Sequence, residues 1–137
     1  MNFEKAAEYT KQFEGLSLRP YKCPTGHLTI GYGHNLENGI TLNIADELLS
    51  ADLRIAEMEV VGQVPYFFKL DDARQFVLVD MCFNMGLKKL LTFKKFFAAL
   101  SKKDYKAAAR EMLDSKWAVQ VGNRAKKLAE IMEKGDY

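Results

Sequence analysis

Residues 14–34 read EGLSLRPYKCPTGHLTIGYGH, and they carry the strongest structural and functional signal of this 137-residue chain. The carboxylic acid of Glu14 falls at the end of a predicted helix. Eight residues separate it from the thiol of Cys23, and five more separate Cys23 from the hydroxyl of Thr29. A single acid facing a small polar pair across a tight hairpin suits the hydrolysis of a glycosidic bond. One group protonates the leaving oxygen, while groups across a cleft hold a water.

The pattern around this stretch predicts a helix followed by a β-hairpin. Apolar residues recur at helical spacing over 3–13, and Gly15 is expected to end that helix. The apolar period then shortens to two, and Pro24-Thr25-Gly26 supplies a turn. Residues 16–34 are therefore expected to form a β-hairpin of modest length.

A long helix is expected next, from about 42 to 61, with Thr41 as its N-cap. Asp52 falls inside the apolar stripe of this helix, where a charge is costly unless it is paired. The predicted stripe comprises Ala45, Leu48, Leu49, Ile55 and Ala56.

The rest of the chain predicts further helices. Asp71 or Asp72 is expected to cap a helix that is apolar almost all round, ends at Gly86 and carries Cys82 as a small core residue. The remaining helices are expected over 93–100 and 105–113, capped by Thr92 and Asp104, in a short turn over 117–121 around a core Trp117, and over 123–134.

These elements predict an α+β fold, mainly α, in one domain spanning 1–137. A small β-hairpin lobe, about 15–40, is joined by the connecting helix, about 42–61, to a helical lobe, about 1–14 and 60–137. A cleft between the two lobes is the expected place for a ligand.

Composition narrows the classes of function. A net charge of only +2 disfavours a dedicated nucleic-acid binder, which usually shows a concentrated basic patch. Two cysteines in a chain of this length do not make a disulfide framework. The start, Met1 to Glu8, has neither a basic region nor a long apolar run, so we expect no signal peptide, and no stretch approaches the length of a membrane span.

Three separated motifs carry a resemblance to a known family. They are the stretch 13–34, Phe83-Asn84-Met85-Gly86, and Ser115-Lys116-Trp117 followed by Gly122-Asn123-Arg124-Ala125-Lys126. With these motifs the chain resembles, over nearly its whole length, the T-even-type phage lysozymes of glycoside hydrolase family 24. The resemblance implies a two-lobe lysozyme-like fold. It also implies an endolysin activity, a muramidase that hydrolyses the β-1,4 bond between N-acetylmuramic acid and N-acetylglucosamine in bacterial peptidoglycan.

The resemblance assigns roles to particular positions. Glu14 matches the general acid, Cys23 the middle catalytic position, which is usually Asp, and Thr29 the residue that helps to place the attacking water. Arg124 matches an arginine that pairs with or orients the acid. The positions that match sugar-facing residues are Tyr21, Gly33, Phe83 and Asn84, and His34 and Asp52 match a buried ion pair between the hairpin and the long helix.

Two departures from the family pattern affect these expectations. The segment between His34 and Thr41 is short, so the β lobe should be reduced to little more than the hairpin. The middle catalytic position holds Cys23 rather than Asp, which leaves the activation of water open. His27, four residues on, favours the thiolate if the turn brings it close, and we prefer water activation shared by Cys23 and Thr29. The resemblance implies inversion of configuration.

The expected partner is the glycan strand of peptidoglycan, with no cofactor, no metal, no nucleic acid and no stable membrane association. The resemblance implies a monomer that waits in the host cytoplasm, is released by a separate holin and acts on the periplasmic wall. The competing hypothesis is a lysozyme-like module that has lost catalysis and serves peptidoglycan binding or localisation. Such a module need not keep Glu14, Thr29 and Arg124 together. A zinc set of Cys23, His27, His34 and Cys82 fits no standard spacing, and a DNA-binding helical domain is disfavoured by the near-neutral charge.

Overall fold

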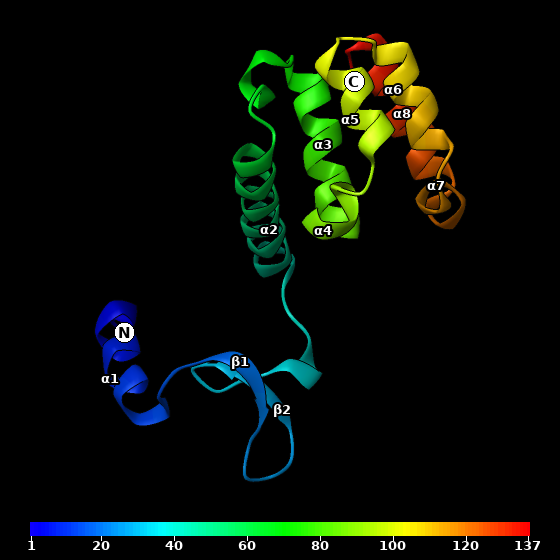
Figure 1. Cartoon of the computed structure of the whole chain (residues 1–137). Helices are drawn as coiled ribbons and strands as arrows, with labels where there is room; N and C mark the ends of the chain where they lie inside the picture. Colours follow the sequence, from blue (N-terminus) through cyan, green and yellow to red (C-terminus); the bar gives the residue numbers. More distant parts are fainter. The chain divides into compact units, whose positions relative to one another are not determined.

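The computed structural model describes all 137 residues and contains two compact units, Met1–Glu47 and Leu48–Tyr137. The first unit holds α1 (Phe3–Glu14) and a small antiparallel sheet, and the second holds a bundle of helices (Figure 1). Helix α2 (Leu42–Gln63) begins in the first unit and continues into the second. The predicted α+β fold, mainly α, is confirmed, whereas the assignment of residues 1–14 to a helical lobe stays a prediction.

Helix α1 is set by local signals at both ends. The Asn2 side chain accepts a hydrogen bond of 3.0 Å from the backbone N–H of Lys5, which caps the N-terminus. Gly15 adopts a φ of +69° and donates its backbone N–H to the carbonyl of Lys11. Because only glycine adopts such a φ at little cost, the helix ends directly after Glu14.

The sheet follows α1 and confirms the predicted hairpin. Strands β1 (Ser17–Lys22), β2 (Leu28–Gly31) and β3 (His34–Asn35) lie in the order β1-β2-β3. The pairing of β1 with β2 is irregular between Ser17 and Tyr21, where Pro20 offers no N–H to the ladder. The two-residue β3 and the 3-10 helix η1 (Leu36–Asn38) were not predicted, and they fill the short segment before Thr41.

The start of α2 agrees with the prediction, but its core-facing side does not. The hydroxyl of Thr41 accepts the backbone N–H of Ile44 at 3.4 Å, as expected of an N-cap. Ala56 and Val60 are buried and Leu53 packs against them in the core of the second unit. The predicted stripe was wrong at four of its five positions, because only Ala56 is buried, while Ala45, Leu48, Leu49 and Ile55 are exposed.

The second unit is built around α3 (Asp72–Met85), whose buried side chains confirm the predicted central helix. Asp71 caps it by accepting the backbone N–H of Arg74 at 3.0 Å, and Gly86 ends it. The other elements are η2 (Phe67–Lys69), α4 (Leu87–Leu90), α5 (Lys94–Ser101), α6 (Tyr105–Leu113), α7 (Lys116–Val121) and α8 (Asn123–Lys134).

Every element of the second unit contributes to one hydrophobic core. Fully burying one apolar side chain of the size of Val, Leu, Phe or Met stabilises a fold by roughly 1.5–3 kcal/mol. Cys82 is buried in this core, as predicted. The least exposed large side chains are Val60, Phe67, Val77, Leu78, Met81, Leu90, Phe96, Leu100, Met112, Trp117 and Met132.

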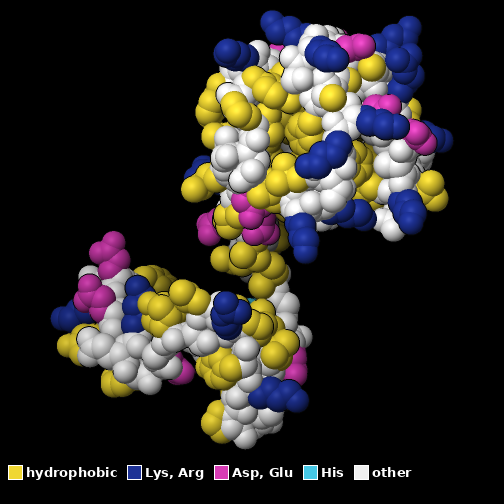
Figure 2. All heavy atoms as spheres, in the orientation of Figure 1, with side chains coloured by type: hydrophobic (Ala, Val, Ile, Leu, Met, Phe, Trp, Pro, Cys, Tyr) yellow, Lys and Arg dark blue, Asp and Glu magenta, His cyan; other side chains and the backbone are white.

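The surface of the second unit carries many Lys and Arg side chains, interspersed with apolar and acidic ones (Figure 2). On α8, Lys126 and Lys127 are exposed while Ala125 and Leu128 are buried, which is the ordinary pattern of an amphipathic helix. A membrane span would need a longer apolar run than any helix here offers.

One predicted helix cap was wrong. Thr92 does not cap α5; its hydroxyl donates backwards to the carbonyl of Lys89 at 2.6 Å, and Phe93 takes the N-cap position without a side-chain bond. Thr side chains bond to a preceding carbonyl as readily as to a following N–H, and α4 supplies that carbonyl. Asp104 does cap α6, through the backbone N–H of Ala107 at 3.1 Å, as predicted.

Arg74 fastens the end of α8 to the start of α3. Its Nε and Nη2 donate to the carbonyls of Met132 and Glu133 at 2.7 and 2.9 Å. Its guanidinium carbon lies 3.4 Å from the ring centroid of Tyr105, a cation–π contact with α6. One side chain therefore binds the last carbonyls of α8 and packs on α6.

Replacing Gly135 with Ala is expected to destabilise the second unit by about 1–3 kcal/mol, because a left-handed φ and a close contact act together. Gly135 has a φ of +77°, and a Cβ there would lie 2.6 Å from Nη1 of Arg74. Gly62→Ala is the control, since Gly62 lies in α2 with nothing within 4 Å of a built Cβ. That change should stabilise by about 0.5–1 kcal/mol. Urea unfolding measures both, and equal effects of the two changes would contradict this account.

Candidate active site

The register of the hairpin brings three predicted site residues to one side of the sheet. Tyr21 pairs directly with Thr29, and the backbone N–H of Cys23 donates to the carbonyl of His27 at 2.9 Å, two residues further along. Side chains of paired residues share a face in an antiparallel sheet, and so do residues two apart on one strand. Tyr21, Cys23 and Thr29 therefore belong to the same face.

Thr29 lies at the centre of the sheet and is its best-protected residue. It pairs with Tyr21 on one side and with Asn35 on the other. Only 4% of it is exposed, and it is the one buried residue of the first unit. Its hydroxyl donates to the carbonyl of His27 at 2.9 Å, so its proton is engaged and its lone pairs are left to accept.

Cys23 lies in a small nest of hydrogen-bond donors made by the turn that follows it. The hydroxyl of Thr25 is 3.1 Å from Sγ. Hydrogen bonds from the Thr25 side chain, and next from the backbone N–H of His27, lower the pKa of Cys23 to about 7 against a smaller opposing effect of burial. A thiol of this kind is substantially ionised at neutral pH.

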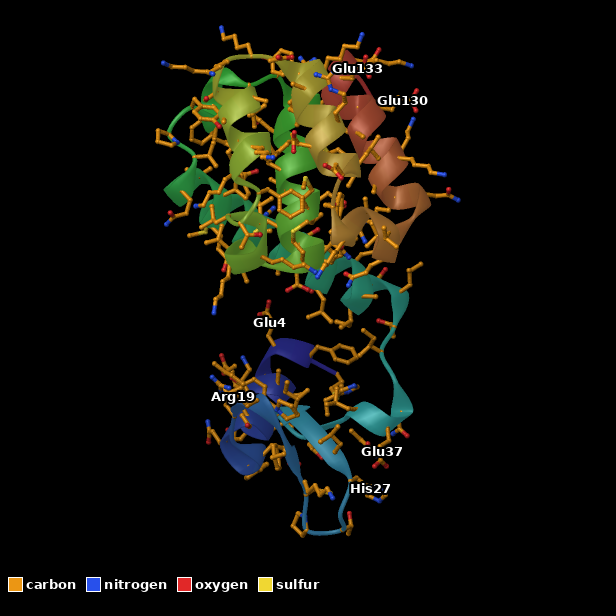
Figure 3. All side chains as sticks on the ribbon, turned by 45° about the vertical axis from the view of Figure 1, so that its right-hand side comes forward. Glu4, Arg19, His27, Glu37, Glu130 and Glu133 are labelled. Atoms are coloured by element: carbon orange, nitrogen blue, oxygen red, sulfur yellow. The ribbon has the colours of Figure 1, made fainter.

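His27 stabilises the thiolate through its backbone rather than its ring. The imidazole Nδ1 lies 2.7 Å from Oε2 of Glu37 in η1 (Figure 3). The ring of His27 is therefore engaged with Glu37, and its effect on the Cys23 thiolate stays a prediction.

Glu14 ends α1 with an exposed carboxyl group that lies against the backbone of Gly33. A Cβ built on Gly33, whose φ is +83°, would lie 2.9 Å from Oε2 of Glu14. Glu14 and Tyr21 line one open hollow of about 300 Å³, together with Gly15, Leu16 and Ser17. The predicted acid, the glycine at a predicted sugar position and the predicted sugar-facing tyrosine thus gather in the first unit.

The second unit holds the other predicted residues. Arg124 donates from Nε and Nη2 to both carboxylate oxygens of Asp80, each at 2.9 Å. Asn84 is exposed at the end of α3 and accepts the indole N–H of Trp117 at 2.8 Å, and Phe83 beside it is 39% exposed. Trp117 itself is buried, as predicted.

Two predicted roles stay predictions. The ring of His34 lies 3.0 Å from the carbonyl of Gly39, within the first unit, while Asp52 is exposed on α2. The predicted ion pair between His34 and Asp52 joins residues of different units. The predicted role of Arg124, which is to pair with or orient Glu14, also joins residues of different units.

Three residues of functional interest were missed from the sequence. Thr25, two residues after Cys23, follows the common pattern of a hydroxyl bonding within its own turn, and that signal was available. Glu37 and Asp80 were not identifiable, because ring-to-carboxylate and guanidinium-to-carboxylate pairs across 10 and 44 positions leave no local pattern.

Neither another hollow nor a metal-binding group of side chains provides an alternative to this site. A larger hollow, of about 470 Å³, lies in the second unit beside Phe93 and Trp117, and none of the predicted site residues lines it. In neither unit do three or more His, Cys, Asp or Glu side chains gather closely enough to hold a metal ion.

Comparison with known proteins gives the family of this chain and then the kind of protein within that family. The family model described as phage lysozyme matches residues 11–133, so the chain belongs to the phage lysozyme family. It is 27% identical to probable T4-type lysozyme 1 of Dictyostelium discoideum, over 91% of each chain. It is 29% identical to the endolysin of Acyrthosiphon pisum secondary endosymbiont phage 1, over 84% of this chain and 78% of that one. These matches place it with the T4-type phage lysozymes, as the motifs predicted.

A third relative shows the same domain in a larger setting. The pre-baseplate central spike protein Gp5 of Enterobacteria phage T4 is 24% identical over 95% of this chain but only 28% of its own length.

Iodoacetamide is expected to alkylate one thiol per chain, because the thiolate is the reactive form. The rate should rise as pH passes through about 7, the pKa of Cys23. Burial, and then the neighbouring Glu59, raise the pKa of Cys82 to about 11, so that thiol should stay unmodified. Mass spectrometry of trapped samples gives the rate, and Cys23→Ser is the control without signal. Labelling of Cys82, or a midpoint near the ordinary thiol value of about 8.5, would contradict the described nest.

Gly33→Ala is expected to reduce lysozyme activity more than Gly31→Ala. Both glycines have a left-handed φ, +83° and +70°, so either change should cost about 1–2 kcal/mol of folding free energy. Only the Cβ at Gly33 meets the carboxyl of Glu14, since nothing lies within 4 Å of one at Gly31. Activity normalised to the folded fraction separates the two effects, and equal normalised activities would count against a placed carboxyl.

Proposed function

We propose that this chain is an endolysin that hydrolyses the β-1,4 bond between N-acetylmuramic acid and N-acetylglucosamine in peptidoglycan. The observation that supports this most is the shared face of Tyr21, Cys23 and Thr29, with Cys23 and Thr29 bonded to the same peptide group. The exposed carboxyl of Glu14, in one hollow with Tyr21, supplies the acid. The names of the relatives, lysozyme and endolysin, agree with this activity.

In the proposed reaction Glu14 is the general acid. Its carboxyl gives a proton to the bridging oxygen as the bond to the anomeric carbon breaks. Charge of the oxocarbenium type develops on the sugar ring. Acid catalysis of this kind typically contributes about 10²–10⁴-fold.

Cys23 and Thr29 act on the water that completes the reaction. The water donates one hydrogen bond to the Thr29 hydroxyl oxygen, whose own proton is held by the carbonyl of His27. The Cys23 thiolate accepts the other proton of the water as its oxygen bonds to the anomeric carbon. The thiol then returns a proton through solvent to the Glu14 carboxylate, so the enzyme is regenerated. Attack by water from the face opposite the leaving group inverts the anomeric configuration.

The remaining roles form part of the same proposal. Tyr21, Gly33, Phe83 and Asn84 face the glycan strand, Arg124 orients the acid, and His34 pairs with Asp52. The enzyme works as a monomer on the periplasmic wall after a separate holin releases it from the host cytoplasm.

Glu14→Gln is expected to lower the rate of peptidoglycan clearing by at least about 100-fold, because the amide cannot give up a proton to the leaving oxygen. Glu8→Gln is the matched control, since it makes the same change at an exposed position of α1 and should keep the wild-type rate. A turbidity assay on purified peptidoglycan measures both. Equal clearing by wild type and Glu14→Gln would contradict the role of Glu14 as the acid, and clearing by neither would favour a wall-binding module without catalysis.

A further inference from the structure

The backbone of His27 joins the two residues that are proposed to handle water. Its carbonyl accepts the hydroxyl of Thr29 and the backbone N–H of Cys23, both at 2.9 Å. Hydrogen bonding from the backbone of His27 is, after the Thr25 side chain, the second cause that lowers the pKa of Cys23. A rotation of the peptide groups flanking His27 would therefore disturb the thiol and the hydroxyl together.

The chain around His27 has little apolar packing to hold it. Residues 24 to 28 form the exposed tip of the hairpin, and the first unit buries no side chain there. Gly26 has a φ of +84° and nothing within 4 Å of a built Cβ, so the turn is free of close neighbours on that side. The position of the His27 peptide must come from hydrogen bonds.

One such bond reaches outside the hairpin. The ring Nδ1 of His27 lies 2.7 Å from Oε2 of Glu37, with which it also forms an ion pair when protonated. Glu37 is itself fixed, because its backbone N–H donates to the Asn35 side chain at 2.9 Å, and Asn35 pairs with Thr29 in the sheet. A closed loop of contacts thus runs from Thr29 through His27, Glu37 and Asn35 back to Thr29.

From this loop we infer that His27 and Glu37 form a positioning pair that holds the His27 peptide group in place for Cys23 and Thr29. Neither side chain touches the substrate in this scheme. The inference rests on the proposed function for its catalytic meaning, although the geometry of the thiol can be tested without any substrate.

The ordinary alternative is an exposed ion pair with no consequence. About half of each side chain is exposed, 50% for His27 and 52% for Glu37, and such pairs are worth little to stability. A stability measurement therefore cannot distinguish the two views. The pKa of the Cys23 thiol can, because it depends on the Thr25 side chain and on the backbone of His27.

The test uses the full chain and two readouts. Alkylation of Cys23 by iodoacetamide, followed across pH, gives the thiol pKa, and peptidoglycan hydrolysis gives kcat and KM. The variants are Glu37→Ala, which removes the partner, and Glu37→Gln, which keeps an oxygen able to accept the ring N–H. Glu130→Gln is the matched control, since Glu130 forms an exposed ion pair with Lys134 at 2.8 Å in the second unit.

Glu37→Ala is expected to raise the thiol pKa by about half a unit to one unit and to lower kcat about 3–10-fold with KM little changed. Glu37→Gln should restore most of both values, and Glu130→Gln should change neither. Combining His27→Ala with Glu37→Ala should add little to either single change.

An unchanged thiol pKa in Glu37→Ala, with the protein folded by circular dichroism, would overturn the positioning role. If the wild-type chain fails to hydrolyse peptidoglycan while Glu37→Ala still shifts the thiol pKa, the proposed function falls and the positioning pair stands. The two failures are therefore distinguishable.

Discussion

The hairpin of the first unit depends on the backbone carbonyl of His27. That carbonyl accepts the hydroxyl of the central Thr29 and the backbone N–H of Cys23, both at 2.9 Å. Thr29 is the only buried residue among the first 47, so hydrophobic packing contributes little to the geometry here. Strand pairing and side-chain hydrogen bonds must supply it. These bonds are individually worth about 0.5–1.5 kcal/mol, which makes their closed arrangement more important than any single member.

The second unit is held together mainly by hydrophobic packing rather than by hydrogen bonds. Its geometry comes from a continuous hydrophobic core around α3, and its polar contacts fasten helix ends to that core. Arg74 binds the final carbonyls of α8, and Arg124 in the first turn of α8 forms a two-bond pair with Asp80 of α3. Both ends of α8 are therefore tied to α3 by arginine. Loss of the Asp80 carboxylate, or of the carbonyls that Arg74 binds, would leave a charged guanidinium group without its hydrogen-bond acceptor.

Local signals in the sequence predicted most of the fold. Gly15 and Gly86 end helices, and Asp71 and Asp104 begin them, because these residues satisfy backbone groups within four positions. The alternation of apolar residues and the turn Pro24-Thr25-Gly26 predicted the hairpin, while its register is known from the structure. The predicted cap at Thr92 was wrong because its hydroxyl can bond either to a following N–H or to a preceding carbonyl. In the structure it donates to the carbonyl of Lys89 in α4. The predicted stripe of α2 was mostly wrong, because only residues in the C-terminal half of this helix, Ala56 and Val60, are buried in the core of the second unit.

The candidate residues of the site could be named from the sequence, but their hydrogen-bond partners could not. Glu14, Cys23 and Thr29 were identified by their spacing, which resembles a known family. The groups that tune them, Thr25 and Glu37, and the partner of Arg124, Asp80, depend on the folded chain. In the proposed mechanism the Cys23 thiol acts as a base, which requires donors that lower its pKa, and the turn supplies them through the Thr25 side chain and then the His27 backbone.

The configuration of the first-formed reducing end tests this account most directly. Proton NMR during the first turnovers on a peptidoglycan fragment distinguishes the two anomers before they equilibrate. Water placed by Cys23 and Thr29 predicts that the α-anomer appears first, from a β-linked substrate. Early formation of the β-anomer would mean that a protein group, and not water, attacks the sugar, and the roles given to the thiol and the hydroxyl would be wrong.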